Sequence, residues 1–241
     1  MIQKRINNLI ADQNPRRLFS EAKRLFNASK EVKDYRRAFQ LLKAASSGGD
    51  PNVHVWLGAA YDYGLGVRPN RRSALNHYRI AANAGNSSAE YHVGVFYHDG
   101  LGVKRNYTLA IDWLRKAVDH GNGDAKHLLG QCYRYGRGVA RNVRKGFELE
   151  LEAAKQGILE AQFSVGVCFS KGEGIKRDSR KALQWYLRAA RRGHQSAAHN
   201  AAVLYETGRG VRANKSKADF WYARAGKSDS ADHELESVFV N

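Results

Sequence analysis

Four glutamates near the middle of the chain are the side chains best suited to acid–base chemistry. The acidic cluster comprises Glu148, Glu150, Glu152 and Glu160. Two neighbouring carboxylates with different pKa values can act as general acid and general base. However, Lys116 lies 36 residues before Glu152, and Arg188 lies 36 residues after it. This spacing favours ion pairs between neighbouring repeats over catalysis, so we expect no catalytic residues in the cluster.

The histidines do not form a pattern typical of a catalytic or metal site. The 9 histidines are scattered, and His92 and His98 are six residues apart, a spacing that puts them on different faces of a helix. Zinc sites need closely spaced His and Cys ligands. A nucleophilic Ser or Cys would need a base and an orienting group nearby. We therefore expect no enzymatic activity, no metal and no cofactor.

The 2 cysteines, Cys132 and Cys168, are separated by 36 residues. Equivalent helices in neighbouring repeats lie roughly 8–10 Å apart, too far for a disulfide. We expect buried thiols in a reducing compartment, which favours a cytoplasmic location. The first ten residues lack the apolar region of a secretory signal, and we find no apolar run of about 18 residues that could span a membrane.

Pairs of glycines recur with a fixed period of 36 residues. The pairs are Gly64 and Gly66, Gly100 and Gly102, Gly136 and Gly138, Gly172 and Gly174, and Gly208 and Gly210. A dinucleotide-binding glycine loop follows a strand and opens a helix, whereas these pairs follow helical patterns five times. The first glycine of each pair is expected to end a helix in the left-handed conformation. We therefore predict structural turns between helices.

The same period governs other positions and predicts an array of helix pairs. An aromatic residue precedes each glycine pair, at Tyr61, Tyr97, Tyr133, Phe169 and Tyr205. A capping residue follows each pair, at Asn70, Asn106, Asn142, Asp178 and Asn214. In the first full repeat we expect helices from about 51 to 63 and from about 71 to 84. In the degenerate repeat before it, Asp34 is expected to cap the second helix.

The predicted fold class is an all-α solenoid in one array. Residues 1–14 form a lead-in, 15–230 hold one degenerate and five full repeats, and 231–241 cover the last repeat as a capping segment. No stretch of the sequence has the alternation of a strand. Terminal repeats differ because one of their faces meets solvent.

The repeat resembles the Sel-one-like repeat family, a relative of the tetratricopeptide repeat. The residues that match best are Gly172, Gly174, Asp178, Lys181, Ala182, Trp185, Tyr186, Ala189 and Ala190. The resemblance implies an α/α right-handed superhelix that acts as a protein-binding scaffold or adaptor. The third full repeat departs from the pattern at residues 146–150, so we expect that repeat to pack differently.

In tetratricopeptide-like stacks, the first helix of each pair lines the concave surface. Transferring that register predicts a partner-binding groove of Val55, Tyr63, Tyr91, His98, Asp99, His127, Arg134, Tyr135, Phe163, Lys171 and His199. Exposed aromatic residues beside Arg and His are typical of binding hot spots. Alternatively, side chains such as Tyr91 and Phe163 simply pack between repeats.

Basic residues gather at the turns that open each second helix. The basic ridge comprises Arg68, Arg71, Arg72, Lys104, Arg105, Arg141, Arg144, Lys145, Lys176, Arg177, Arg180, Arg212 and Lys215. Together with the net charge of +17, the ridge favours an acidic partner. A solvated charged edge without function remains the alternative interpretation.

From these features we predict a non-enzymatic adaptor that binds a protein with an acidic surface in the groove. That partner could belong to signalling or secretion, or be a toxin that the chain neutralises. The alternative function is electrostatic binding of nucleic acid or an anionic membrane surface through the basic ridge.

Overall fold

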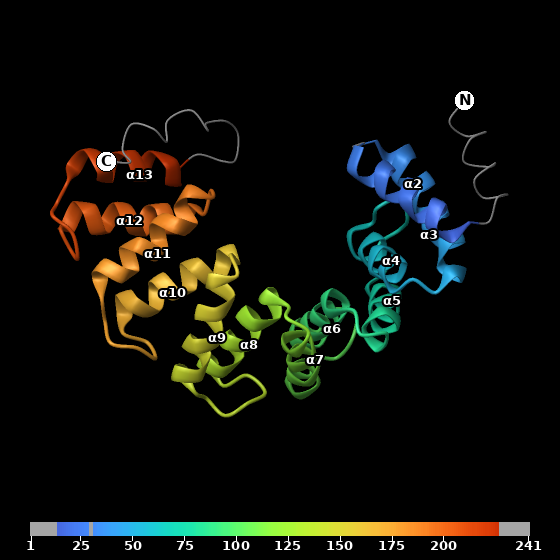
Figure 1. The fold of residues 1–241 in the computed structure, drawn as a ribbon, viewed down its shortest axis with the longest axis horizontal. Helices are drawn as coiled ribbons and strands as arrows, with labels where there is room; N and C mark the ends of the chain where they lie inside the picture. The colour runs from blue at the N-terminus through green and yellow to red at the C-terminus, as the bar shows by residue number, and fades with distance from the viewer. Residues whose placement is uncertain (1–13, 29–30, 227–241) are drawn as a thin grey trace. The chain divides into compact units, whose positions relative to one another are not determined.

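The computed structural model describes residues 14–28 and 31–226 as an all-α repeat solenoid (Figure 1). The helices are α2 Pro15–Ala28, α3 Val32–Ala45, α4 Pro51–Tyr63, α5 Arg71–Asn83, α6 Ser87–Asp99, α7 Tyr107–Asp119, α8 Gly123–Tyr135, α9 Val143–Lys155, α10 Leu159–Lys171, α11 Ser179–Arg191, α12 Gln195–Thr207 and α13 Lys215–Ala225. A short 3₁₀ helix, Ser46–Gly48, follows α3. These described ranges contain no strand, as predicted. The predicted capping segment and almost all of the lead-in lie outside them.

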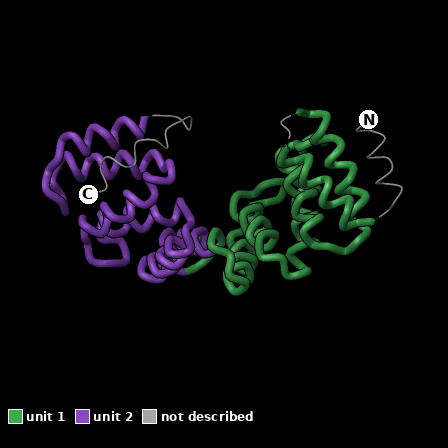
Figure 2. The backbone as a smooth tube through the Cα atoms, turned by 45° about the horizontal axis from the view of Figure 1, so that its top comes forward, with its two compact units in different colours: residues 1–125, 137–139 green, residues 126–136, 140–241 purple. Residues whose placement is uncertain are grey.

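The chain divides into two compact units (Figure 2). Unit 1 comprises residues 1–125 and 137–139, and unit 2 comprises residues 126–136 and 140–241. In unit 1, α4 packs on α5, α5 on α6, and α6 on α7. In unit 2, the same succession runs from α9 to α13, and α10 also contacts α12. Each unit therefore consists of helix pairs that pack on the next pair along the chain.

The helix ends follow the predicted capping signals. The Asp50 side chain accepts a hydrogen bond from the Asn52 N–H at the start of α4. Asn70 does the same for Ser73 at the start of α5, at 3.0 Å. Helix α4 ends at Tyr63 and is followed by Gly64, whose φ of 73° is left-handed. These contacts satisfy backbone groups that a helix leaves unpaired at its ends.

The predicted cap at Asp34 was wrong. Helix α5 begins at Arg71, one period after residue 35, whereas α3 already begins at Val32. Asp34 therefore lies inside the first turn of α3, where its carboxylate pairs with Arg37 at 3.1 Å. An acidic side chain in the first turn still stabilises the helix through the helix dipole.

One backbone hydrogen bond closes the turn between the two helices of each full repeat. The N–H of the capping residue donates to the carbonyl of the aromatic residue nine positions earlier. The bonds join Asn70 to Tyr61, Asn106 to Tyr97, Asn142 to Tyr133, Asp178 to Phe169 and Asn214 to Tyr205, at 2.7–2.9 Å. This bond spans the same number of residues in each full repeat, so the turn between the two helices has a constant length.

In four of the helix pairs, a glycine in the first helix makes room for a side chain from the second. A Cβ on Gly58 would lie 2.6 Å from the ring of Tyr78. The equivalent pairs are Gly94 with Leu114, Gly130 with Glu150, and Gly166 with Tyr186. The second residue of each pair is buried. Glu150 thus occupies a core position that tyrosine or leucine fills in three other repeats.

Candidate functional site

The predicted groove residues differ widely in exposure. Those exposed to solvent are Tyr63, Asp99, Tyr135, Lys171 and His199. Those partly buried are Val55, Tyr91, His127 and Phe163. Phe163 stacks on the His194 ring at 4.4 Å, so packing within the protein accounts for this side chain. The exposed group contains the two most accessible large aromatic residues of the described chain, Tyr63 at 69% and Tyr135 at 57%.

Two predicted groove residues lie inside the protein. His98 is buried in unit 1, where its Nδ1 lies 2.6 Å from Asp99 Oδ1. Arg134 is 5% exposed in unit 2. The register that places both on one face does not reveal that neighbouring side chains cover them. Both side chains are almost completely covered by the rest of the protein.

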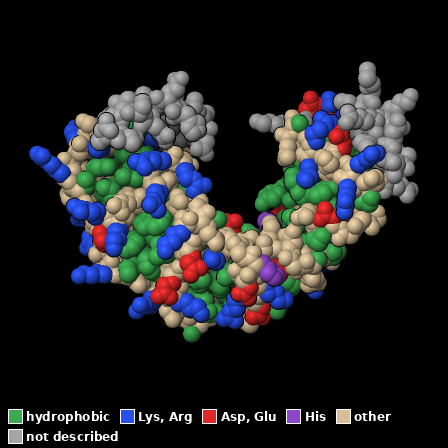
Figure 3. Space-filling view, viewed as in Figure 1, with side chains coloured by type: hydrophobic (Ala, Val, Ile, Leu, Met, Phe, Trp, Pro, Cys, Tyr) green, Lys and Arg blue, Asp and Glu red, His purple; other side chains and the backbone are tan. Residues whose placement is uncertain are grey.

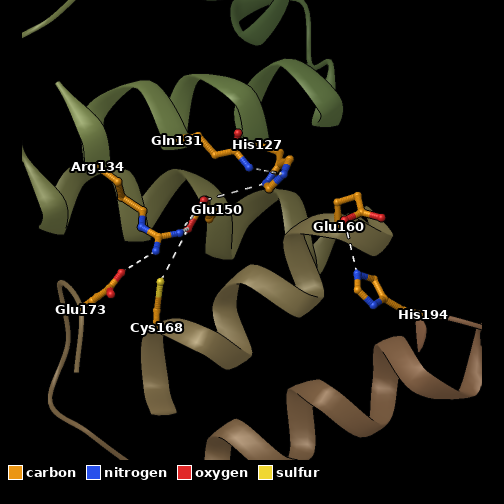
Figure 4. Close-up of polar contacts among 8 residues, drawn as sticks. All are labelled: His127, Gln131, Arg134, Glu150, Glu160, Cys168, Glu173 and His194. Carbon is orange, nitrogen blue, oxygen red and sulfur yellow. Dashed lines mark hydrogen bonds and ion pairs between the residues drawn. The ribbon is translucent and has the colours of Figure 1, made fainter. Parts of the chain in front are cut away.

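Arg134 is the centre of a buried polar cluster in unit 2 (Figure 4). Its Nη1 donates to both carboxylate oxygens of Glu150 on α9, at 3.1 and 3.0 Å. Its Nη2 donates to Glu173 Oε2, in the turn between α10 and α11, at 2.5 Å. The Cys168 thiol on α10 lies 3.6 Å from Glu150 Oε2. One guanidinium thus connects α8, α9 and the turn of the next repeat.

A departure from the repeat pattern creates the space for this cluster. Ala74, Ala110, Ala182 and Ala218 occupy the position that Gly146 holds in this repeat. A Cβ on Gly146 would lie 2.5 Å from Arg134 Cγ and 2.7 Å from the Gly130 carbonyl oxygen. The absence of a side chain at Gly146 therefore allows Arg134 to reach Glu150. The expectation that this repeat packs differently agrees with these contacts.

The sequence analysis treated Glu150 as one member of an acidic cluster and missed its burial. The signal that could have revealed it is its register, which it shares with Tyr78, Leu114 and Tyr186. A carboxylate at a core position requires a cationic partner. Glu173 was missed as well, because its register in the turn holds residues of different types.

The charges in the cluster depend on one another. Burial lowers the pKa of Arg134, but the charge of Glu150 and hydrogen bonds to both carboxylates more than offset this, so its pKa lies above the ordinary value. Burial raises the pKa of Glu150, and Arg134 offsets part of that rise. Burial and the Glu150 carboxylate raise the pKa of the Cys168 thiol to about 12. The thiol therefore stays protonated at neutral pH and is a poor nucleophile.

The remaining acidic residues contact basic or histidine side chains within their own repeats, whereas the sequence predicted ion pairs between repeats. Glu148 pairs with Arg144 at 3.2 Å, and Glu160 lies 3.3 Å from His194 Nε2. Glu152 pairs with Lys126 at 2.9 Å, instead of the expected Lys116 and Arg188. The expectation of two buried cysteine thiols is also confirmed.

All thirteen residues of the basic ridge are exposed. Figure 3 shows Lys and Arg side chains among apolar patches on the visible face of unit 2. Some ridge charges are partly compensated: Arg144 pairs with Glu148, and Lys215 lies 4.0 Å from Asp219. Arg141 Nε donates to the Arg134 carbonyl oxygen at 3.0 Å. The ridge is thus accessible, although not every cation in it is available to a partner.

Two histidines of unit 1 meet at close range. His54 on α4 and His77 on α5 place their Nδ1 atoms 3.0 Å apart, and His77 also stacks on Tyr61. Burial lowers the pKa of both, and the charge of His54 lowers that of His77 further. A hydrogen bond between two imidazole nitrogens requires that one of them be unprotonated.

We expect this pair to make the protein less stable in mild acid. The folded pKa values lie below the unfolded value of about 6.5. The contribution of the uncharged histidine pair to the free energy of unfolding is therefore complete above that pH. It is lost as the pH falls toward the folded pKa values. The measurement is urea unfolding at several pH values between neutrality and mild acid.

The control is the double variant His54→Gln, His77→Trp, which copies Gln162 and Trp185 of a later repeat. Its stability should fall less with acidification than that of the natural protein. Equal pH dependence of the two proteins would contradict the assignment.

Two further features of the described residues bear on function. None of the described helices combines the length and the apolar character that crossing a bilayer requires. Within the same residues, His, Cys, Asp and Glu do not form groups of three or more that could hold a metal ion.

Comparisons with known proteins agree with this architecture. The family described as Sel1 repeat matches residues 25–50, 53–86, 87–122, 123–158, 159–194 and 195–230. No curated protein matches the sequence. A Sel1 repeat protein from Oxalobacter formigenes has a similar structure, with 28% identity and a TM-score of 0.82 over 92% of this chain and 89% of that chain.

Two other solved structures are similar. The antigen c5321, described as a protective antigen of uropathogenic Escherichia coli with an SLR fold, is 26% identical with a TM-score of 0.81; the match covers 92% of this chain and 48% of that one. The immunity protein Pa5087 from Pseudomonas aeruginosa shares the fold at 22% identity and a TM-score of 0.60, over 88% of this chain and 80% of that one. Because the Sel1 repeat pattern spans most of the sequence, the chain belongs to the Sel1 repeat family.

Proposed function

We propose that this protein is a non-enzymatic adaptor whose exposed first-helix residues bind a partner protein with an acidic surface. Sel1 repeat proteins generally mediate protein–protein interactions. The observation that carries the proposal for this chain is the exposure of Tyr63 and Tyr135. Each is the last residue of the first helix in its repeat, at the ends of α4 and α8. Burial of a large aromatic ring is the commonest source of hot-spot energy.

The charge of the chain supports an acidic partner. The net charge is +17, and Lys171, at the position equivalent to Tyr135 one repeat later, is exposed. A cationic surface attracts an acidic partner and accelerates its association. The exposed aromatic rings would then supply the contacts that slow its dissociation.

The test is retention of the native partner on the immobilised full-length chain. Changing Tyr63→Ala together with Tyr135→Ala should weaken binding by about 2 kcal/mol or more, the usual size of a hot-spot effect. The matched control changes Ile80→Ala and Leu109→Ala, two exposed apolar residues on second helices. Normal binding by the tyrosine variant would contradict the proposal.

The accessible basic ridge supports one alternative function, electrostatic binding of nucleic acid or an anionic membrane surface. Reversing Arg141, Arg144 and Lys145 to Glu distinguishes the two. For a protein partner this change should mainly slow association. For nucleic acid held by 6–10 phosphate contacts, affinity should fall about 10³–10⁵-fold between 50 and 200 mM salt. Loss of partner binding in the ridge variant, with normal binding in the tyrosine variant, would favour the alternative.

A further inference from the structure

The Arg134 side chain has an unusual distribution of hydrogen bonds. Its Nη1 is fully used by Glu150, and its Nη2 donates to Glu173. Its Nε is buried and has no acceptor among the described residues. A buried donor without a partner is costly, and such groups usually have a reason.

The two nitrogens Nε and Nη2 lie on the same edge of the guanidinium. That edge can bind both oxygens of one carboxylate in parallel, which is the strongest arrangement for this pair of groups. Glu173 uses only half of it, because Oε2 contacts Nη2 while Oε1 lies 3.9 Å from Lys171 Nζ. Glu173 therefore occupies this edge but bonds to only one of its two nitrogens.

The Glu173 side of this edge leads to the surface of unit 2. Glu173 has a side-chain exposure of 36%, and Lys171 has one of 65%. The Tyr135 ring, which is 57% exposed, lies 5.3 Å from the guanidinium carbon. In Figure 4, Glu173 approaches Arg134 from the turn, on the side away from Glu150. Two predicted groove residues, Arg134 and Lys171, thus contact one carboxylate, and a third, Tyr135, lies beside the guanidinium.

The charges around Glu173 indicate that a carboxylate from another molecule could take its place. Glu150 is fully buried and already neutralises Arg134. Lys171 supplies a second positive charge beside Glu173. A carboxylate from another molecule would bring the same charge to the same place. It could also satisfy Nε, which Glu173 leaves without an acceptor.

We propose that Arg134, Lys171 and Tyr135 form a carboxylate-binding site that Glu173 occupies in the unbound protein. An acidic group of the partner displaces Glu173 and bonds to the Nε and Nη2 edge of Arg134, while Tyr135 packs on the neighbouring partner surface. The inference rests on the proposed function and specifies the chemistry of one anchor point. Either a side-chain carboxylate or a chain-terminal carboxylate has the required chemistry.

The experiment compares Glu173→Gln with Glu148→Gln in the full-length chain. Both changes remove one negative charge from unit 2, but Glu148 pairs with Arg144 on α9, away from the Arg134 edge. The probe is a hexapeptide of alternating glycine and glutamate with both ends blocked. A second probe replaces its glutamates with glutamine and has a free carboxyl end. Affinity is measured by calorimetry, and the arginine Nε–H signals are followed by NMR.

We expect Glu173→Gln to bind one of the two peptides about fivefold more tightly than the natural protein, because a half-exposed ion pair is worth up to about 1 kcal/mol. One arginine Nε–H signal should shift as that peptide binds. Glu148→Gln should bind like the natural protein. The peptide that responds identifies the source of the carboxylate.

Three outcomes would overturn the site. They are equal affinities in all three proteins, an equal gain in Glu148→Gln, and undetectable binding of both peptides. If the native partner is still lost in the Tyr63 and Tyr135 variant, only the carboxylate site fails and the adaptor function stands.

Discussion

Replacing Glu150 with alanine is expected to lower the free energy of unfolding by about 3–5 kcal/mol, because it leaves a buried arginine without its principal counter-charge. Arg134 is 5% exposed, and its Nη1 donates to both carboxylate oxygens of Glu150. Glu173 would remain on Nη2, but it cannot replace bonds to the other nitrogen. The measurement is urea unfolding followed by circular dichroism.

A rescue variant separates the loss of charge pairing from the loss of volume. Arg134→Ser, Gly146→Ala and Glu150→Tyr together copy Ser170, Ala182 and Tyr186 of the next repeat. There the tyrosine hydroxyl forms hydrogen bonds with Ser170 and Asn200. Gly130 is retained and leaves room for the ring, as Gly166 does for Tyr186.

We expect the triple variant to recover part of the lost stability, since well-packed groups often replace buried ion pairs without cost, while the Cβ added at position 146 still requires the Gly130 carbonyl oxygen to shift. The single change Gly146→Ala, with Arg134 still present, should be destabilising because its Cβ meets Arg134 Cγ. If the triple variant is no more stable than Glu150→Ala, the side chains of the next repeat cannot replace the buried Arg134–Glu150 ion pair in this position.

Replacing Gly66 with alanine is expected to destabilise unit 1 by about 3 kcal/mol, from left-handed strain and overpacking together. Gly66 has a φ of 76°. Its Cβ would overlap the Tyr35 carbonyl oxygen and lie 2.6 Å from the Arg36 nitrogen, both backbone atoms of α3. Backbone atoms in a helix cannot move aside as a flexible side chain can.

The matched control for this prediction is Gly85→Ala. Gly85 has a similar φ of 80°, but no atom lies within 4 Å of the added Cβ. It should therefore lose only about 1–2 kcal/mol, the cost of the left-handed conformation itself. Thermal unfolding of both variants measures the difference. Equal losses would mean that conformation alone explains Gly66, and that contact with α3 contributes nothing.

The contacts of Gly66 and its equivalents show what the second glycine of each pair does. The sequence suggested a role in reversing the chain. In the structure, a Cβ on Gly102 would meet Arg71, and one on Gly174 would meet the Val143 carbonyl oxygen. Each of these contacts is with the start of a helix one repeat earlier. The second glycine thus allows close approach between repeats as well as a tight turn.

The sequence by itself determined the period, the helix bounds and most helix caps. These features depend on local chemistry, because a cap such as Asn70 acts on the N–H of Ser73 and a glycine such as Gly64 permits positive φ wherever it stands. The repetition of the pattern then predicted that helix pairs stack, since one pair alone cannot bury its apolar faces. Asp34 shows the limit of the register, because a degenerate repeat can start its helix earlier.

Only the tertiary structure decided the roles of Arg134, Glu150 and Glu173. In sequence, each is a charged residue among many, and the ordinary expectation for such a residue is solvent exposure. They come from two different helices and a turn, and the space between them exists because Gly146 lacks a side chain. Whether a charge is buried, paired or open to a partner depends on neighbours that are distant along the chain. Packing alone brings Arg134 and Lys171 to the Glu173 carboxylate and places the Tyr135 ring beside the Arg134 guanidinium.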